Sequence, residues 1–249
     1  MEARTKASTE VRTLPVIEIF GPTIQGEGAE AGLPCNFIRF GGCDYRCSWC
    51  DSMYAVDPAE VRANAEHLTV DEITSRLGTL GGNAPWVVVS GGNPALLQLG
   101  PLVSELHGSG RKVAVETQGS LWKPWLGAVD RLTVSPKAPS SGMDTERHRS
   151  QLGRFMEAAR VANDDGLVLK IVCFDEIDLA WAKEVSGDWP SVPLFLSAGT
   201  PVPSPPDLLA AVAARFRWLS ESVANDPVLA RARVLPQLHV VAWGDARGV

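Results

Sequence analysis

Short apolar runs alternate along the chain with segments whose apolar residues recur every three to four positions. The runs predict strands, and the periodic segments predict helices. Strands separated by helical segments are typical of a parallel sheet with crossover connections, so the pattern predicts an α/β fold. The expected strands are Val16–Phe20, Asn36–Phe40, Trp86–Ser90, Lys112–Thr117, Arg131–Ser135, Val168–Phe174, Pro193–Leu196 and His239–Trp243.

Helical patterns lie between most of these strands. The first begins at the capping box Thr69-Val70-Asp71-Glu72 and is expected to end near Leu80, because Gly81-Gly82 follows and stops it. The other expected helices are Ala95–Gly108, Arg147–Ala162, Glu176–Val185 and Pro206–Val223.

One crossover is expected to be abbreviated. Residues 119–130 separate two expected strands, contain Pro124 and are too few for a full crossover helix. No linker divides the chain, which predicts one domain over residues 15–249. Residues 1–14 are expected to form a polar N-terminal tail.

Three cysteines lie close together in a polar loop. Cys43, Cys47 and Cys50 have the spacing C-x3-C-x2-C, and no fourth cysteine is near them. A structural zinc site takes four Cys or His ligands, which disfavours zinc because the nearest histidine is His67. Three thiolates can instead hold three irons of a [4Fe–4S] cluster and leave the fourth iron open to a small molecule. The run therefore predicts such a cluster.

The two remaining cysteines have a different setting. Cys35 and Cys173 each lie in an apolar run with strand character, so they are expected to be small core residues.

Composition and charge favour a small molecule as the partner. The chain has 249 residues, 45% of them hydrophobic and 21% charged, which is enough to bury a sizeable core. Its net charge of −6 gives no general attraction for nucleic acid. There is no signal-peptide pattern and no apolar run of membrane-spanning length, so no membrane partner is expected. Clustered cysteines favour a reducing compartment, and a cytoplasmic location is expected.

Glycine and polar residues follow three of the expected strands. They are Ser90-Gly91-Gly92-Asn93-Pro94, Glu116-Thr117-Gln118-Gly119 and Ser135-Pro136-Lys137. In parallel α/β barrels the ligand-binding groups come from the carboxyl ends of the strands. Any such turn favours Gly, Ser, Asn and Pro, so one turn alone indicates little. Together with the cysteine loop they predict one binding rim.

The cysteine spacing, with aromatic Trp49 just before Cys50, resembles that of radical S-adenosylmethionine (SAM) enzymes, in which SAM binds the open iron and is cleaved to a 5′-deoxyadenosyl radical. Beyond the loop, the chain from Pro15 to Val249 resembles the 7-carboxy-7-deazaguanine synthases. The motifs that carry this resemblance are Glu18-Ile19-Phe20-Gly21-Pro22-Thr23-Ile24-Gln25-Gly26-Glu27-Gly28, Phe37-Ile38-Arg39, Cys50-Asp51-Ser52, the three strand-end runs, and Leu235-Pro236-Gln237-Leu238-His239 with Trp243-Gly244.

This resemblance implies a fold and a reaction. The implied fold is a partial (β/α) barrel of about six parallel strands with a reduced set of helices. The implied reaction is the ring contraction of 6-carboxy-5,6,7,8-tetrahydropterin to 7-carboxy-7-deazaguanine with loss of ammonia, in 7-deazapurine (queuosine-type) biosynthesis. A flavodoxin- or ferredoxin-type reductant and a homodimer are implied as well. Whether the product enters tRNA modification or a deazapurine natural product stays open.

The resemblance also implies roles for single residues. The cluster ligands would be Cys43, Cys47 and Cys50. The SAM contacts would be Trp49, Cys50, Asp51, Gly92, Ser135, Pro136 and Lys137. The pterin contacts would be Ile24, Gln25, Gly26, Glu27, Arg39, Ser90, Gln237 and His239.

Several of these residues have ordinary alternative roles. Gly92 and Pro136 suit simple turns, and Arg39 suits an ion pair at a strand end. Glu27 suits a surface loop, and His239 suits a core position. An anionic carboxylate on the substrate nevertheless suits the fork of an arginine, which favours Arg39 as its partner.

Ser52 matches the family position whose hydroxyl binds Mg²⁺, with Asp51 supporting it. One hydroxyl with substrate oxygens and water suits this hard, octahedral ion. Alternatively, Ser52 is a turn residue that bonds its own backbone.

Two stretches depart from the pattern. Asn93 stands where many radical SAM enzymes have a Glu that receives the amino group of SAM, and an amide accepts a hydrogen bond without adding charge. The run Phe195–Thr200 aligns poorly with the family's late SAM-binding strand end, so it is left out of the expected site.

Two other functions share part of the signal. A radical-generating activase for a glycyl radical enzyme has the same cysteine spacing but needs no pterin pocket. A non-catalytic iron–sulfur carrier is disfavoured because only three clustered cysteines are present.

Overall fold

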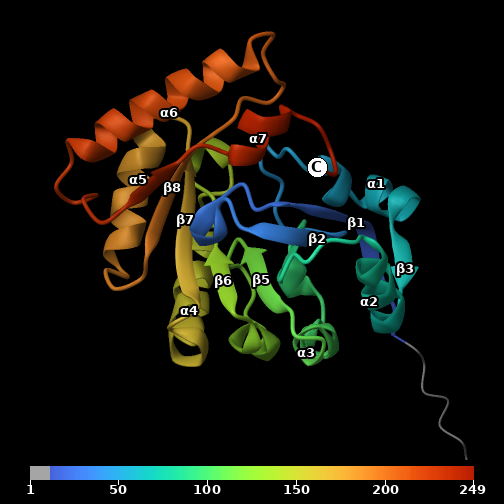
Figure 1. The fold of residues 1–249 in the computed structure, drawn as a ribbon. Coiled ribbons are helices and arrows are strands. Elements are labelled where there is room, and N and C mark those ends of the chain that lie inside the picture. Colours follow the sequence, from blue (N-terminus) through green and yellow to red (C-terminus); the bar gives the residue numbers. More distant parts are fainter. Residues whose placement is uncertain (1–11) are drawn as a thin grey trace, which may run out of the picture.

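The computed structural model describes residues 12–249, and a single mixed β-sheet organises them. Its strand order is β3-β1-β2-β4-β5-β6-β7-β8-β9. From β2 to β9 along this order all neighbours are parallel, while β1 is antiparallel to both β2 and β3 (Figure 1). The strands are β1 (Leu14–Ile24), β2 (Pro34–Phe40), β3 (Glu66–Leu68), β4 (Trp86–Gly91), β5 (Lys112–Thr117), β6 (Arg131–Val134), β7 (Leu167–Cys173), β8 (Leu194–Ala198) and β9 (Arg233–Leu235).

Helices connect most of the parallel strands and lie along the outside of the curved sheet (Figure 1). They are α1 (Pro58–Asn64), α2 (Val70–Thr79), α3 (Gly100–Gly108), α4 (Glu146–Asn163), α5 (Glu176–Gly187), α6 (Leu208–Ala224) and α7 (Leu238–Trp243). The predicted α/β fold, a partial barrel of parallel strands, is confirmed.

The hydrophobic core lies between the sheet and these helices. Strand residues such as Val87 and Leu169 pack in one buried cluster with Leu102 of α3, Phe155 of α4 and Leu179 of α5. Burying one such side chain stabilises the fold by about 1.5–3 kcal/mol. The helices therefore cover one face of the sheet. They do not cover the carboxyl ends of the strands, where a site can form.

Local sequence signals set several element ends. The capping box before α2 is present, because Thr69 Oγ1 accepts from the Glu72 N–H and Glu72 accepts from the Thr69 N–H. The abbreviated crossover is also confirmed: residues 119–130 contain only the 3₁₀ helix Pro124–Ala128. Trp125 anchors that helix by donating its indole N–H to the Leu97 carbonyl at 3.1 Å.

The predicted strand His239–Trp243 is wrong, because these residues belong to α7. Val240 and Val241 favour a strand by propensity, but packing overrides this weak preference. The N–H of Leu238 donates to the carbonyl of Gly26 at 3.0 Å, and Gly244 ends the helix with a φ of 67°. The helix therefore packs against the turn at Gly26, after β1, and does not extend the sheet.

Two other parts of the chain differ from expectation. The first strand begins at Leu14 and runs to Ile24, so Leu14 is not part of a polar tail, while residues 1–11 of the expected tail lie outside the described residues. Helix α1 and the short strands β3 and β9 were not predicted.

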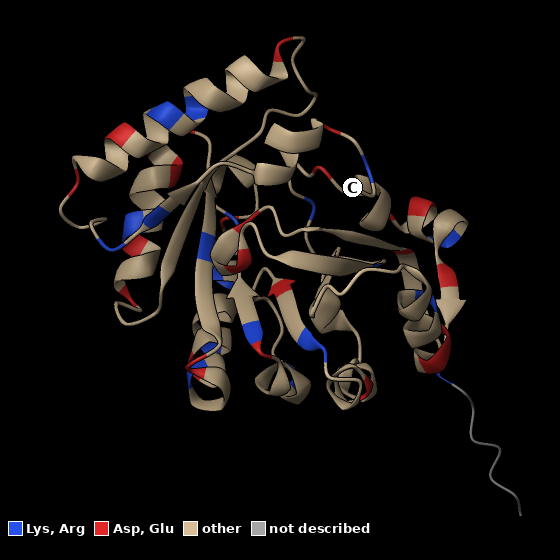
Figure 2. Cartoon of the chain, in the orientation of Figure 1, with Lys and Arg blue, Asp and Glu red and all other residues tan. Residues whose placement is uncertain are grey.

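Acidic and basic residues are interspersed over the helices, the loops and some of the strands (Figure 2). Within residues 12–249, no helix has the length and apolar character needed to cross a membrane.

Candidate active site

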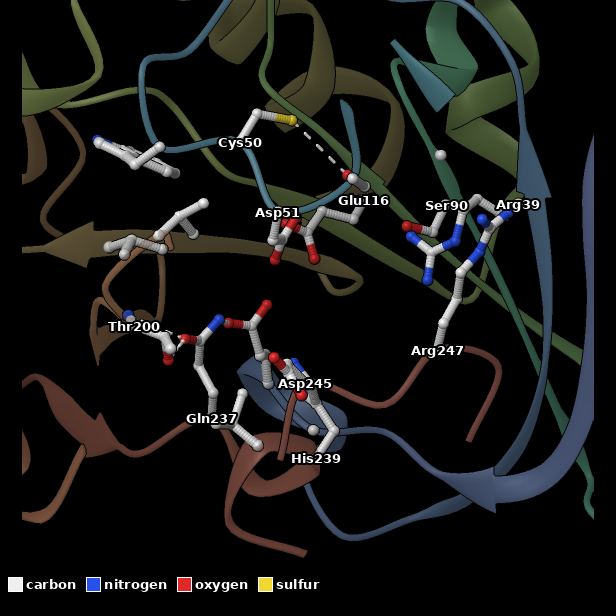
Figure 3. Close-up of a pocket in the computed structure, with 18 of the residues that line it drawn as sticks. Arg39, Cys50, Asp51, Ser90, Glu116, Thr200, Gln237, His239, Asp245 and Arg247 are labelled. Carbon is white, nitrogen blue, oxygen red and sulfur yellow. Dashed lines mark hydrogen bonds between the residues drawn. The ribbon is translucent and has the colours of Figure 1, made fainter. Parts of the chain in front are cut away.

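A cavity of about 410 Å³ opens at the carboxyl ends of the parallel strands. The cysteine loop, the turn after β1 and the last residues of the chain complete its wall (Figure 3). Cavities of this size hold small organic ligands. The predicted site residues that line it are Ile24, Gln25, Gly26, Glu27, Arg39, Cys43, Cys47, Trp49, Cys50, Asp51, Ser52, Ser90, Gly92, Lys137, Gln237 and His239. Ser135 and Pro136 are buried and do not line it.

Backbone hydrogen bonds fix the cysteine loop to the segments that follow β4 and β6. The N–H of Asn93 donates to the Gly42 carbonyl at 2.7 Å, and the N–H of Ser48 donates to the Ser141 carbonyl at 2.9 Å. A Cβ atom at Gly92 would lie 2.2 Å from the Gly42 oxygen, so only glycine permits this close approach. The loop is therefore held in place before any ligand binds.

Burial keeps two of the three thiols protonated in the metal-free chain. It raises the pKa of Cys47 to about 11 and raises that of Cys43 as well. The sulfur of Cys43 accepts from the Tyr45 N–H at 3.4 Å and from the Gln118 side-chain amide at 3.6 Å. Metal binding needs thiolates, so it must release protons from these groups.

The three thiols fit a cluster better than a single ion. No group of three or more His, Cys, Asp or Glu side chains in residues 12–249 is arranged to hold one metal ion. Cys43, Cys47 and Cys50 nevertheless line the same cavity. In a [4Fe–4S] cluster each thiolate binds a different iron, so the thiols need not converge on one point.

Asn93 anchors the cysteine loop. Its amide N–H groups donate to Asp44 Oδ1 at 2.9 Å and to Ser120 Oγ at 3.0 Å, while its oxygen accepts from the Thr117 hydroxyl at 2.8 Å. Gln118 donates to the same Asp44 oxygen at 2.6 Å. Asn93 is buried and does not line the cavity, so its amide is already used within the protein.

Trp49 is held at the wall by a buried carboxylate. Its indole N–H donates to Ser140 Oγ at 2.9 Å, and that hydroxyl donates to Asp178 at 2.6 Å. The Trp49 ring also packs on Phe174, with ring centroids 5.1 Å apart. Lys137 lies near the same ring and donates to Ser135 Oγ at 3.1 Å, so Ser135 supports the wall from behind.

The turn after β1 meets the residues before α7. The carboxylate of Glu27 accepts from the Gln237 amide at 2.7 Å, and Gln237 in turn accepts from the Thr200 backbone N–H at 3.2 Å and from its hydroxyl. A Cβ atom at Gly26 would lie 2.1 Å from the His239 ring, so glycine is required there. Two motifs far apart in sequence thus form one side of the cavity.

A buried lysine joins two carboxylates in the cavity wall. Lys170 Nζ lies 2.5 Å from Glu27 and 2.6 Å from Glu116, and its side chain is only 2% exposed. Burial alone would raise the pKa of Glu27, but the positive charge of Lys170, the nearby His239 ring and the hydrogen bonds from Lys170 and Gln237 together lower this pKa to about 2. Burial alone would lower the pKa of Lys170, but the two carboxylates raise it. Glu27 and Lys170 are therefore both charged at neutral pH.

Arg39 lies on the opposite side of the cavity, at the end of β2. Its Nε donates to Glu18 at 2.5 Å, and the same Glu18 oxygen accepts from the Tyr54 hydroxyl at 3.0 Å. Ser90 is its partner in the neighbouring strand β4. The expected ion pair of Arg39 is therefore present, and the residue still lines the cavity.

Comparison with known proteins places the chain in a family. It is 41% identical over 241 residues to the 7-carboxy-7-deazaguanine synthase of Bacillus cereus, an alignment that covers 95% of this chain and 99% of that protein. The Bacillus subtilis 7-carboxy-7-deazaguanine synthase is 40% identical, with 95% and 98% covered. The chain belongs to the 7-carboxy-7-deazaguanine synthase family. No protein-family model matches it.

Solved structures agree on the fold. QueE from Escherichia coli has a TM-score of 0.65 at 21% identity, over 91% of this chain and 95% of that chain. SuiB from Streptococcus suis, in a structure bound to S-adenosylmethionine, has a TM-score of 0.52 at 12% identity, over 80% and 51%. Together these findings confirm the predicted function, a radical SAM ring contraction in deazapurine biosynthesis that makes the protein a lyase.

The structure adds residues for which the sequence predicted no individual role. Lys170, Glu116, Tyr54, Thr200 and Arg247 all line the cavity. One signal was available: Lys170 is the single charged residue in the apolar strand Leu167–Cys173, where a lysine is out of place unless it is paired. Thr200 ends the run Phe195–Thr200, which aligns poorly with the family pattern.

Proposed function

We propose that this chain contracts the ring of 6-carboxy-5,6,7,8-tetrahydropterin to give 7-carboxy-7-deazaguanine and ammonia. The observation that best supports this substrate is the arrangement of charge in the cavity: a guanidinium on one side and a carboxylate on the other. A carboxypterin has a carboxylate at one end and an amino-substituted pyrimidine ring, rich in N–H donors, at the other. The two ends match Arg39 and Glu27.

The remaining roles are those that the family resemblance implies, and the position of the residues in the cavity supports them. Cys43, Cys47 and Cys50 would hold the [4Fe–4S] cluster, and Trp49, Asp51, Gly92 and Lys137 would contact SAM beside it. When bound, these two groups supply the radical chemistry. Gln25, Gly26, Gln237 and His239 would contact the pterin ring, and the loop and α7 would exclude water from it.

Turnover tests the proposal directly. The protein is reconstituted with iron and sulfide without oxygen, then supplied with SAM, a strong reductant and the carboxytetrahydropterin. We expect 7-carboxy-7-deazaguanine and ammonia in equal amounts. Cleavage of SAM that leaves the pterin untouched, with a radical appearing on a partner protein, would instead support an activase.

Replacing Arg39 with alanine is expected to weaken binding of the carboxypterin far more than binding of SAM. Losing the partner of a desolvated carboxylate costs about 2–5 kcal/mol. Dissociation constants of both ligands, measured on the reconstituted protein, provide the test. Arg76→Ala is a matched control, because Arg76 pairs with Glu66 outside the cavity. Equal weakening of both ligands would make Arg39 a structural residue only.

A Mg²⁺ ion at Ser52 is part of the proposal. Ser52 and Asp51 line the cavity, and Ser52 Oγ lies 3.8 Å from the Cys50 sulfur. So small a protein contribution suits Mg²⁺, which keeps several waters and takes oxygens from substrates.

After removal of divalent ions by a chelator, added Mg²⁺ is therefore expected to raise turnover, and Ser52→Ala is expected to blunt that rise without loss of the cluster spectrum. Ser48→Ala is the control, since Ser48 shares the loop but does not line the cavity. A mutant with the wild-type Mg²⁺ response would remove Ser52 from the metal site, and full activity without any divalent ion would remove the metal.

The working state of the protein completes the proposal. By family resemblance we propose a homodimer in the cytoplasm, reduced by a flavodoxin- or ferredoxin-type protein. A sedimentation experiment that finds only monomer would contradict the dimer.

A further inference from the structure

Two cavity-lining arginines from distant parts of the chain share the carboxylate of Glu18, which lies behind them and does not itself line the cavity. Arg39, at the end of β2, donates to Glu18 Oε1 at 2.5 Å, and Arg247, near the end of the chain, donates to Glu18 Oε2 at 3.3 Å. All three lie where β1, β2 and the segment 244–249 meet. Figure 3 shows the guanidinium groups of Arg39 and Arg247 gathered beside the Ser90 side chain.

The position of Arg247 is set by its own segment. Gly244 ends α7 with a φ of 67° and directs the following residues along the cavity, where residues 244–249 form part of the lining. The guanidinium carbon of Arg247 then lies 3.5 Å from the centroid of the Tyr54 ring. A guanidinium stacked on an aromatic face keeps its orientation while its N–H groups stay free to donate.

The charges do not balance within this group. One Glu18 carboxylate lies between two guanidinium groups, which leaves this group of three side chains with one net positive charge. Among residues 12–249, the only side-chain hydrogen bonds that Arg39 and Arg247 donate come from their Nε atoms. The terminal nitrogens of both forks therefore remain available to an anion, and a carboxylate is the planar anion that an arginine fork fits.

The ion pair with Glu18 does not by itself explain why an arginine stands at position 247. The Arg247 side chain is 51% exposed, and an ion pair of that exposure contributes little to stability. Glu18 already has Arg39 and Tyr54 as partners. A second arginine here adds little to the fold, but it doubles the donors that face the ligand.

We propose that Arg247 is a second specificity residue for the substrate. It binds the carboxylate of the substrate together with Arg39. This rests on the proposed function, because the carboxypterin supplies the anion. SAM also has a carboxylate, so the test has to separate the two sources. If the substrate carboxylate is the ligand, Arg247 distinguishes a carboxylated pterin from one without the group.

The test compares two stable, fluorescent probes, 6-carboxypterin and unsubstituted pterin, on the reconstituted protein with SAM present. We expect Arg247→Gln to raise the dissociation constant of 6-carboxypterin roughly tenfold or more. This is the effect of losing one hydrogen bond to a charged group. Binding of unsubstituted pterin and of SAM is expected to stay at the wild-type level. Arg247→Lys keeps the charge without the fork, so it should recover part of the loss.

Arg76→Gln is the matched control, an ion-paired and partly exposed arginine outside the cavity. If Arg247→Gln weakened the binding of both pterins equally, or of neither, the proposed role of Arg247 would be wrong. If it weakened only the binding of SAM, Arg247 would bind the SAM carboxylate instead. Wild-type protein that binds neither pterin would contradict the proposed function rather than this residue's part in it.

Discussion

Alanine in place of Cys43, Cys47 or Cys50 is expected to abolish both the [4Fe–4S] absorption of the reconstituted protein and its turnover. Each thiolate would hold a separate iron. When one thiolate is removed, the other two therefore cannot bind its iron in its place. Backbone hydrogen bonds hold the loop at Gly42, before its first cysteine, and at Ser48, between its second and third, which opposes a shift that would bring in another ligand.

The other two cysteines provide the control within the same chain. Cys35 and Cys173 are fully buried in β2 and β7, and burial raises the pKa of Cys35 to about 12 and that of Cys173 as well. Neither lines the cavity. Cys35→Ala and Cys173→Ala are therefore expected to leave iron content and spectrum intact. A fully loaded cluster in any of the three loop mutants would refute the assignment.

The sequence was most informative where chemistry requires residues close together in the chain. A cluster loop needs its thiols within a few residues, so its spacing is visible without a structure. The same holds for the capping box at Thr69 and Glu72, where the two partners lie three residues apart. The strands were predictable for a related reason, since burial on both faces forces continuous apolar runs such as Val87-Val88-Val89.

Contacts between distant segments were not predictable in this way. Gln237 and Glu27 are 210 residues apart, and only the fold brings them together. Helix α7 was mistaken for a strand because Val240 and Val241 have strand propensity, whereas the Leu238–Gly26 hydrogen bond that places it is tertiary. The pairing of Arg247 with Glu18 is of the same kind, which is why Arg247 had no signal in the sequence.

Lys170→Met is expected to destabilise the folded protein by about 3–5 kcal/mol near neutral pH, the usual cost of breaking a buried ion pair from one side. Methionine has a similar length and no charge. It would leave the carboxylates of Glu27 and Glu116 facing each other without the ammonium that now lies within 2.6 Å of both. Urea-induced unfolding of the anaerobic protein, wild type against mutant, measures the difference.

The pH dependence of that difference distinguishes a lost ion pair from a packing defect. In the wild type the folded-state pKa of Glu27 is lowered from 4.5 to about 2, so its contribution is present above pH 4.5 and is lost only as the pH falls toward 2. Without Lys170, burial would raise the pKa of Glu27 above its ordinary value. The mutant would then be most stable in mild acid and lose stability as the pH rises through that raised pKa. The difference in free energy of unfolding between wild type and mutant should therefore increase from about pH 4 to pH 7.

Lys183→Met is the matched control for this prediction. Lys183 also pairs with a carboxylate, Asp226, but its side chain is 36% exposed and solvent can replace the lost partner. Its expected cost is below about 1 kcal/mol, with little dependence on pH. A Lys170→Met protein whose deficit matched that of Lys183→Met, or stayed constant between pH 4 and pH 7, would show that Lys170 does not hold Glu27 in its charged form. The wall that carries Glu27 would then depend on packing alone.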